Sequence, residues 1–111
     1  MLPHSKRLST TLFSKVLEQG RVLHTPLGSL FFTQASGISR FSVSVPKKVS
    51  KGAVERNKIR RRAYSAIRGF EDKIKTGYHG VLVMKKGVEK LPFQELAVEI
   101  EKIFVKSGLL K

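Results

Sequence analysis

The spacing of apolar residues changes several times along the chain, and each change predicts the boundary of a helix or a strand. Three helices are predicted, each ended by a glycine. The first is capped by Ser9, Thr10 or Thr11 and ends at Gly20, the second is capped by Ser50 and ends at Gly69, and the third has Pro92 in its first turn and ends at Gly108. Strands are predicted where apolar residues alternate with polar ones or run together: 22–24, 29–33, 40–45 and 78–86. Met1 to Leu8 is polar and basic and is expected to be loose. The element order is therefore α-β-β-β-α-β-α.

Strand 40–45 shows the cleanest alternation in the sequence. Its residues divide between two faces: Phe41, Val43 and Val45 on one, and Arg40, Ser42 and Ser44 on the other. We therefore expect one dry sheet face and one polar face that can receive a ligand. A chain of 111 residues without repeats or linkers is expected to form one domain over residues 1–111. The predicted fold class is α+β, a small mixed sheet with the helices packed on its dry face.

Two aromatic residues are adjacent in strand 29–33. Because adjacent strand residues point to opposite faces of a sheet, only one of Phe31 and Phe32 can enter a given core face. The sequence leaves open which of the two does so. Phe13 lies on the apolar side of the first predicted helix and is interpreted most simply as a core residue.

The segment from Pro46 to Phe70, PKKVSKGAVERNKIRRRAYSAIRGF, is rich in Lys and Arg. At about 100° per residue, its apolar residues share one side of a helix: Ala53, Ile59, Ala63, Ala66, Ile67 and Phe70. The other side is polar and mostly cationic, with two arginines at its edge: Asn57, Lys58, Arg61, Tyr64 and Arg68, with Arg56 and Arg60. No acidic residue lies between Arg56 and Arg68, so neighbouring like charges repel one another. This pattern predicts that a partner supplies the neutralising charge.

Composition strengthens this prediction. The chain holds 22 Lys and Arg against 8 Asp and Glu, a net charge of +14, whereas solubility asks for a charge of only roughly 2–8 in a small domain. A polyanion partner is therefore favoured over a merely solvated face. The sequence has no Cys, no secretory signal and no apolar run near the ~18 residues of a membrane span, which favours the cytoplasm. No membrane partner is expected, because the stripe of Ala and Ile is typical of a core-facing helix.

No pattern in the sequence is typical of a catalytic site made by the protein. His4, His24 and His79 are scattered, the acidic residues are spread out, and no glycine-rich phosphate loop is present. We therefore expect no catalytic residue and no metal ligand in the chain itself. Nucleic acid is the favoured partner, because cations bind phosphates and aromatic rings stack unpaired bases. RNA or a single strand is favoured over duplex DNA, because a strand and not a helix precedes the basic helix.

The segment from Phe41 to Arg68 resembles the bacterial ribonuclease P protein component. That family carries a strand ending in V-S-K-K-V, followed by A-V-x-R-N-R-x-K-R-x-x-R-E-x-x-R. Here the matching residues are Lys47-Lys48-Val49, Ala53-Val54 and Arg56-Asn57. The flanks agree as well, with Arg7-Leu8, Phe13 and Gly20 in the first helix and Phe31-Phe32-Thr33 in a strand. The resemblance covers nearly the whole chain.

The sequence departs from that pattern at several positions. Lys58 replaces an arginine, Arg60-Arg61 replace Lys-Arg, Tyr64-Ser65 stand where Arg-Glu is usual, Pro46 replaces a serine, and Leu17 replaces an aromatic residue. These changes keep most of the charge but alter its geometry, because Arg and Lys are not interchangeable.

The resemblance implies a fold and a mechanism. The fold would contain a left-handed β-α-β crossover. The protein would be one subunit of a ribonucleoprotein endoribonuclease, bound one to one with a catalytic RNA that holds Mg²⁺ and removes the 5′ leader of precursor tRNA. Carried over residue by residue, the RNA-subunit side comprises Lys47, Lys48, Arg56, Asn57, Lys58, Arg60, Arg61 and Arg68. The leader side comprises Phe13, Phe32, Ser42 and Ser44.

Two alternative functions stay open at the level of sequence. A ribosomal-type structural protein would bind RNA tightly without distinguishing precursor from mature tRNA. A nucleoid-type protein would prefer duplex DNA.

Overall fold

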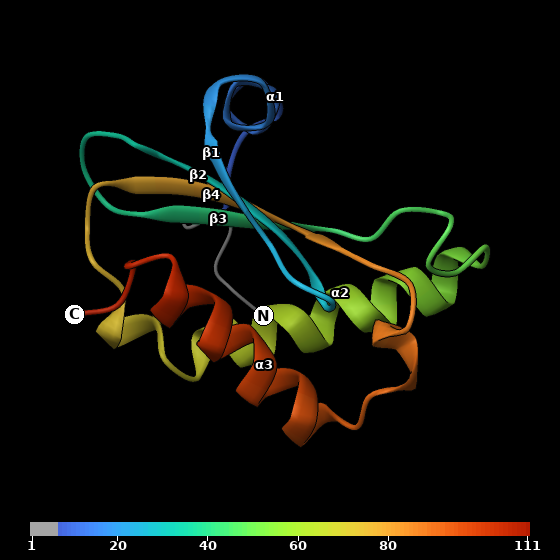
Figure 1. Cartoon of the computed structure of the whole chain (residues 1–111). Helices are drawn as coiled ribbons and strands as arrows, with labels where there is room; N and C mark the ends of the chain where they lie inside the picture. Colours follow the sequence, from blue (N-terminus) through green and yellow to red (C-terminus); the bar gives the residue numbers. More distant parts are fainter. Residues whose placement is uncertain (1–6) are drawn as a thin grey trace.

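A four-stranded sheet separates one helix from two others (Figure 1). The computed structural model describes residues 7–111, so most of the segment predicted to be loose, residues 1–6, lies outside the described part. The helices are α1 (Thr10–Gln19), α2 (Ala53–Arg68) and α3 (Phe93–Lys106). The strands are β1 (Arg21–His24), β2 (Gly28–Gln34), β3 (Arg40–Ser44) and β4 (Tyr78–Met84). Two short 3₁₀ turns, η2 (Glu71–Lys73) and η3 (Val88–Lys90), complete the order, which confirms the predicted one.

The strands lie in the order β1-β2-β4-β3. The pairs β1–β2 and β2–β4 are antiparallel, whereas β3 and β4 are parallel neighbours, so the sheet is mixed as predicted. Helix α2 connects β3 to β4 and therefore forms a β-α-β crossover. The left-handed sense of this crossover stays a prediction.

Local capping explains where the first two helices begin. Of the three predicted candidates, Ser9 caps α1, because its Oγ accepts a hydrogen bond from the backbone N of Leu12 at 3.3 Å. The prediction that Ser50 caps α2 is wrong, since Gly52 occupies the cap position without a side-chain bond. The carbonyl oxygen of Ser50 instead accepts a hydrogen bond from Nη1 of Arg56 at 3.0 Å.

The placement of α1 corrects the prediction that all helices pack on one face. Helices α2 and α3 cover one face of the sheet, and α1 lies across the other (Figure 1). The reason is that the polar face also carries apolar residues. Val81 of β4 and Val16 of α1 are both buried, with at most 1% of each residue exposed, and neither belongs to the main core. A small second core therefore forms under α1.

The main core lies between the sheet and the helices α2 and α3. The ring of Phe104 stands edge-on to Phe41 at 5.2 Å and to Phe70 at 5.1 Å between centroids. The predicted stripe of α2 is buried from Ile59 onward, but Ala53 is exposed. Ala53 begins the helix, so the stripe contacts the core only from the second turn.

Tyr64 is the one residue of the predicted cationic side that turns inward. Its side chain is only 3% exposed, and its hydroxyl oxygen accepts a hydrogen bond from the backbone N of Val43 at 3.0 Å. Because β3 is an edge strand, an outward N–H group there lacks a strand partner. The guanidinium of Arg7 lies 4.9 Å from the ring centroid of Tyr64. Tyr64 therefore fastens α2 to the edge of the sheet.

We predict that Tyr64→Phe lowers the free energy of unfolding by about 1–3 kcal/mol, because it leaves the buried N–H of Val43 without its acceptor. Urea unfolding would measure the change. Ser65→Ala is the matched control, since Ser65 is exposed on the same helix. Equal stabilities of the two variants would contradict this role of Tyr64.

Candidate nucleic-acid interface

The cationic side of α2 faces away from the sheet. Of the eight residues predicted for the RNA-subunit side, six are exposed: Lys47, Lys48, Asn57, Lys58, Arg61 and Arg68. The other two, Arg56 and Arg60, are half-buried at the edge of the helix, where the sequence places them. The lysine pair lies in the turn after β3, which the backbone N of Val49 closes by donating to the carbonyl of Pro46 at 3.0 Å. The structure thus brings the lysines and the arginines onto neighbouring surfaces.

Arg56 and Arg60 also organise the protein itself. Nη1 of Arg56 donates to the carbonyl oxygens of Ser50 at 3.0 Å and Lys51 at 2.6 Å, which ties the loop before α2 to the first turn of the helix. Nη1 of Arg60 donates to Oδ1 of Asn57. These bonds limit the motion of the two guanidinium groups and leave their remaining N–H donors for a ligand.

A shallow groove of about 460 Å³ lies on the same helix. Val54, Asn57, Arg60 and Arg61 line it. Three of these four residues belong to the predicted RNA-subunit side, whereas Val54 matched the family motif without being assigned a role there.

Three of the four residues predicted for the leader lie on the α1 side of the sheet: Phe13, Ser42 and Ser44. Phe13 is half-buried on α1, one turn before the buried Val16, and Ser44 is half-buried on β3. Ser42 is only 7% exposed, and its Oγ accepts a hydrogen bond from the backbone N of Leu8 at 3.1 Å. The chain's own segment before α1 therefore covers Ser42, while Phe13 and Ser44 stay accessible.

Phe32 is not on this face, which corrects the prediction. It pairs with Gly80, and Gly80 pairs with Phe41, so all three share the face that packs on α2 and α3. Phe32 accordingly packs against the main core. Of the two adjacent rings, that of Phe31 lies on the α1 side. It is half-buried, and Phe31 pairs with Val81. The adjacency of the two rings predicted that one would enter the core, but the register decides which.

The α1 side of the sheet also carries positive charge from residues that were not among the predicted site residues, Arg40 and Lys15. Arg40 of β3 and His79 of β4 are register partners on this face. The pKa of His79 lies below its ordinary 6.5, mainly because burial disfavours the imidazolium and further because Arg40 and Lys15 repel it. Lys15 lies on α1, so these three groups come from three elements. In the sequence, the alternation along strand 40–45 indicated this charge only for Arg40, which it places on the polar face.

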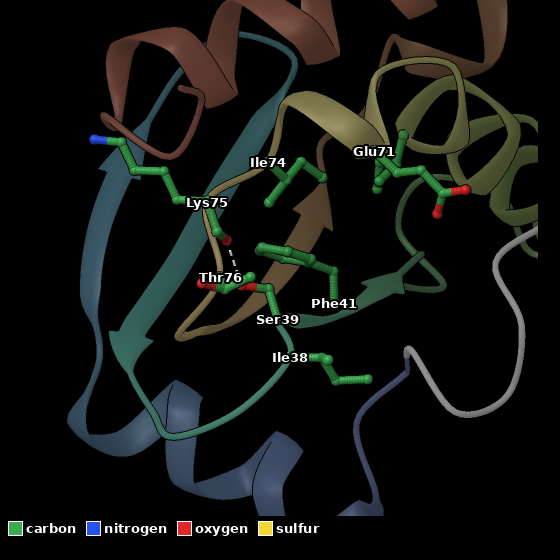
Figure 2. A pocket seen from close by; sticks show the side chains of 8 residues that line it. Ile38, Ser39, Phe41, Glu71, Ile74, Lys75 and Thr76 are labelled. Carbon is green, nitrogen blue, oxygen red and sulfur yellow. Dashed lines mark hydrogen bonds between the residues drawn. The ribbon is translucent and has the colours of Figure 1, made fainter.

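A separate cavity of about 150 Å³ lies beside the start of β3 (Figure 2). Its lining is mostly apolar and includes Phe41, Ile67 and Ile74. The charged ends of Glu71 and Lys75 point away from its centre (Figure 2). The cavity therefore offers mainly apolar contacts.

Neither a metal cage nor a membrane helix is found in the described part of the chain. Over residues 7–111, no three His, Asp or Glu side chains gather closely enough to hold a metal ion. Over the same residues, no helix combines the length and the apolar character that crossing a bilayer requires.

The fold and this charged surface define a class: a small basic α+β protein with a cationic helix on one side of its sheet and a half-open polar face on the other. The model of the family Ribonuclease P matches residues 2–108. A ribonuclease P protein component of Symbiobacterium thermophilum is 31% identical over 108 residues, which are 95% of this chain and 93% of that protein. One of Microcystis aeruginosa is 33% identical over 76 residues, which are 68% of this chain and 63% of that protein.

A solved structure of the Staphylococcus aureus RNase P protein superposes with a TM-score of 0.85 at 16% identity, over 96% of this chain and 98% of that one. This likeness shows the shared fold. The chain belongs to the ribonuclease P protein family. Its function class is therefore tRNA 5′-end processing as part of a ribonucleoprotein.

We predict a pH dependence of stability that comes from His79. A histidine with a lowered pKa binds fewer protons in the folded state than in the unfolded state near and below pH 6.5, so the free energy of unfolding decreases as the pH falls through this range. Urea unfolding at pH 7.5 and pH 5.5 should show a larger decrease for the wild type than for His79→Gln. An equal decrease in both proteins would contradict the assignment.

Proposed function

We propose that this protein is the subunit of a ribonuclease P whose catalytic RNA hydrolyses precursor tRNA at the 5′ end. The cationic face of α2 binds the RNA subunit, with one protein per RNA. The face under α1 holds the single-stranded 5′ leader. The observation that carries the proposal is the family match over residues 2–108, together with the position of α1 and α2 on opposite sides of one sheet (Figure 1).

The α2 face is suited to a folded RNA. Lys58, Arg61 and Arg68 are exposed on one helix, and Lys47 and Lys48 extend the charge beyond its start. Each cation that neutralises a phosphate releases counterions, so affinity depends on salt and little on base sequence. The mutual repulsion of these charges in the free protein decreases when phosphates lie between them.

The α1 side is suited to a single strand. Phe13 and Phe31 offer rings that can stack unpaired bases, and Lys15 and Arg40 offer cations for the phosphates between them. Binding of the leader here favours the precursor over the mature tRNA, because only the precursor has a leader. This difference in affinity would allow the product to leave.

Hydrolysis itself belongs to the RNA subunit in this proposal. The side chains of residues 7–111 do not gather into a set of carboxylates that suits Mg²⁺, so we assign the ion to the RNA. When bound there, Mg²⁺ activates water and stabilises charge on the phosphate. The protein's cations reduce repulsion between the two RNAs, which lowers the Mg²⁺ concentration that assembly needs. The proposed location is the cytoplasm, where precursor tRNA is made.

Processing of a precursor tRNA by a bacterial ribonuclease P RNA at low Mg²⁺ tests the proposal. Added protein should restore cleavage, and more strongly for a leader of several nucleotides than for a very short one. Tight RNA binding without restored cleavage would overturn the proposal and favour a structural RNA-binding protein of ribosomal type.

We predict that Arg61→Ala weakens binding to the RNA subunit and makes the salt dependence less steep, by roughly one unit of slope for one lost phosphate contact. Filter binding at several salt concentrations would measure both effects. Lys106→Ala, which removes an exposed cation of α3, is the matched control. An unchanged slope for Arg61→Ala would remove this residue from the interface.

Phe31 and Phe32 provide a matched pair for the leader face. If Phe31 stacks a base, Phe31→Ala should weaken binding of precursor tRNA by on the order of 1–3 kcal/mol and leave binding of mature tRNA unchanged. Phe32→Ala should instead lower the free energy of unfolding by on the order of 2 kcal/mol, because its ring packs on the main core. A selective loss of precursor binding in Phe32→Ala, and not in Phe31→Ala, would reverse our assignment of faces.

A further inference from the structure

One exposed apolar side chain lies beside Asn57, Arg60 and Arg61 of α2. Val54, in the first turn of α2, is 83% exposed, more than the other large apolar residues found exposed in the described chain. A single exposed valine has little significance alone. This one, however, forms a wall of the groove that Asn57, Arg60 and Arg61 also line. The other valines found exposed in the described chain lie elsewhere: Val22 on β1, and Val98 and Val105 on α3.

Most of the polar groups around this groove are hydrogen-bond donors. Val54, Asn57 and Arg61 are spaced i, i+3 and i+7, so they form one stripe along α2. Oδ1 of Asn57 accepts a hydrogen bond from Nη1 of Arg60, which occupies one of its two acceptor positions, and the amide NH₂ of Asn57 adds two donors. Arginine has no acceptor at all. The groove therefore combines an apolar wall with a rim of donors.

This combination distinguishes between the parts of an RNA. A phosphate needs donors but gains nothing from an apolar wall, whereas an unpaired base has both a flat apolar face and polar edges. Among the bases, guanine presents two adjacent acceptors, O6 and N7, which a guanidinium can bind with two hydrogen bonds. Adenine places a donor beside N7, and that donor would oppose a rim made of donors.

We propose that the groove of Val54, Asn57, Arg60 and Arg61 binds one unpaired guanine of the RNA subunit. The base packs against Val54, and its O6 and N7 accept hydrogen bonds from the rim. This inference rests on the proposed function and adds to it a base-specific contact within a surface that otherwise binds phosphates. That contact fixes the register of α2 on the RNA, which charge alone does not do.

Val54→Ala tests the proposal with the full-length protein and the full-length RNA subunit. Because Val54 is exposed, the variant should unfold at the same urea concentration as the wild type. Its affinity for the RNA should fall about three- to tenfold at every salt concentration, with the salt slope unchanged, because no charge is removed. Arg61→Ala should change the slope. Val105→Ala on α3 is the matched control and should change neither quantity.

Chemical methylation of guanine N7 in the same complexes identifies the base. One unpaired guanine should be protected by the wild-type protein and by Val105→Ala and should become reactive with Val54→Ala and with Arg61→Lys. Unchanged affinity of Val54→Ala, or the absence of such a guanine, would overturn the inference while cleavage assisted by the wild type still supports the proposed function. Failure of the wild-type protein to bind the RNA would overturn both.

Discussion

The parallel pairing of β3 with β4 determines where the rest of the chain can lie. Parallel neighbours cannot be joined by a tight turn, so the chain must return along the sheet, and α2 is the element that returns. Its buried stripe and the bond from Val43 to Tyr64 hold it against the sheet and its edge strand. The cationic face therefore points outward because of packing, although its charges repel one another.

In the proposed function, the two sides of the sheet bind different RNAs: the α2 side binds the RNA subunit and the α1 side binds the leader. One face is a continuous core with α2 and α3, and it gives the rigidity that a charged helix needs to present its side chains in a fixed arrangement. The other face carries only a small core under α1 and leaves rings, hydroxyls and cations half-covered beside it. A rigid basic surface suits a folded RNA, and a half-open polar face suits a flexible strand.

Much of this architecture follows from local sequence. The cap of α1 among residues 9–11, the end of α2 at Gly69 and the strand at Arg40–Ser44 depend on neighbouring residues only, and the structure confirms them. The charge of +14 and the run of cations on α2 are likewise properties of the sequence, because no fold can bury so many unpaired charges. The class of partner could therefore be predicted, and the family motif made that prediction specific.

Other features depend on contacts between distant residues. Strand alternation shows that Phe31 and Phe32 separate, but only the pairing of Phe32 with Gly80 and Phe41 decides which ring enters the main core. A helical wheel places Tyr64 among the cations. In the structure its hydroxyl instead points inward and accepts a hydrogen bond from the backbone N–H of Val43 on the edge strand β3. Leu8 covers Ser42 for a similar reason. The helices, the strands and the charge follow from local sequence, whereas the face on which each side chain lies depends on tertiary contacts, because strand register and edge hydrogen bonds join segments far apart in the chain.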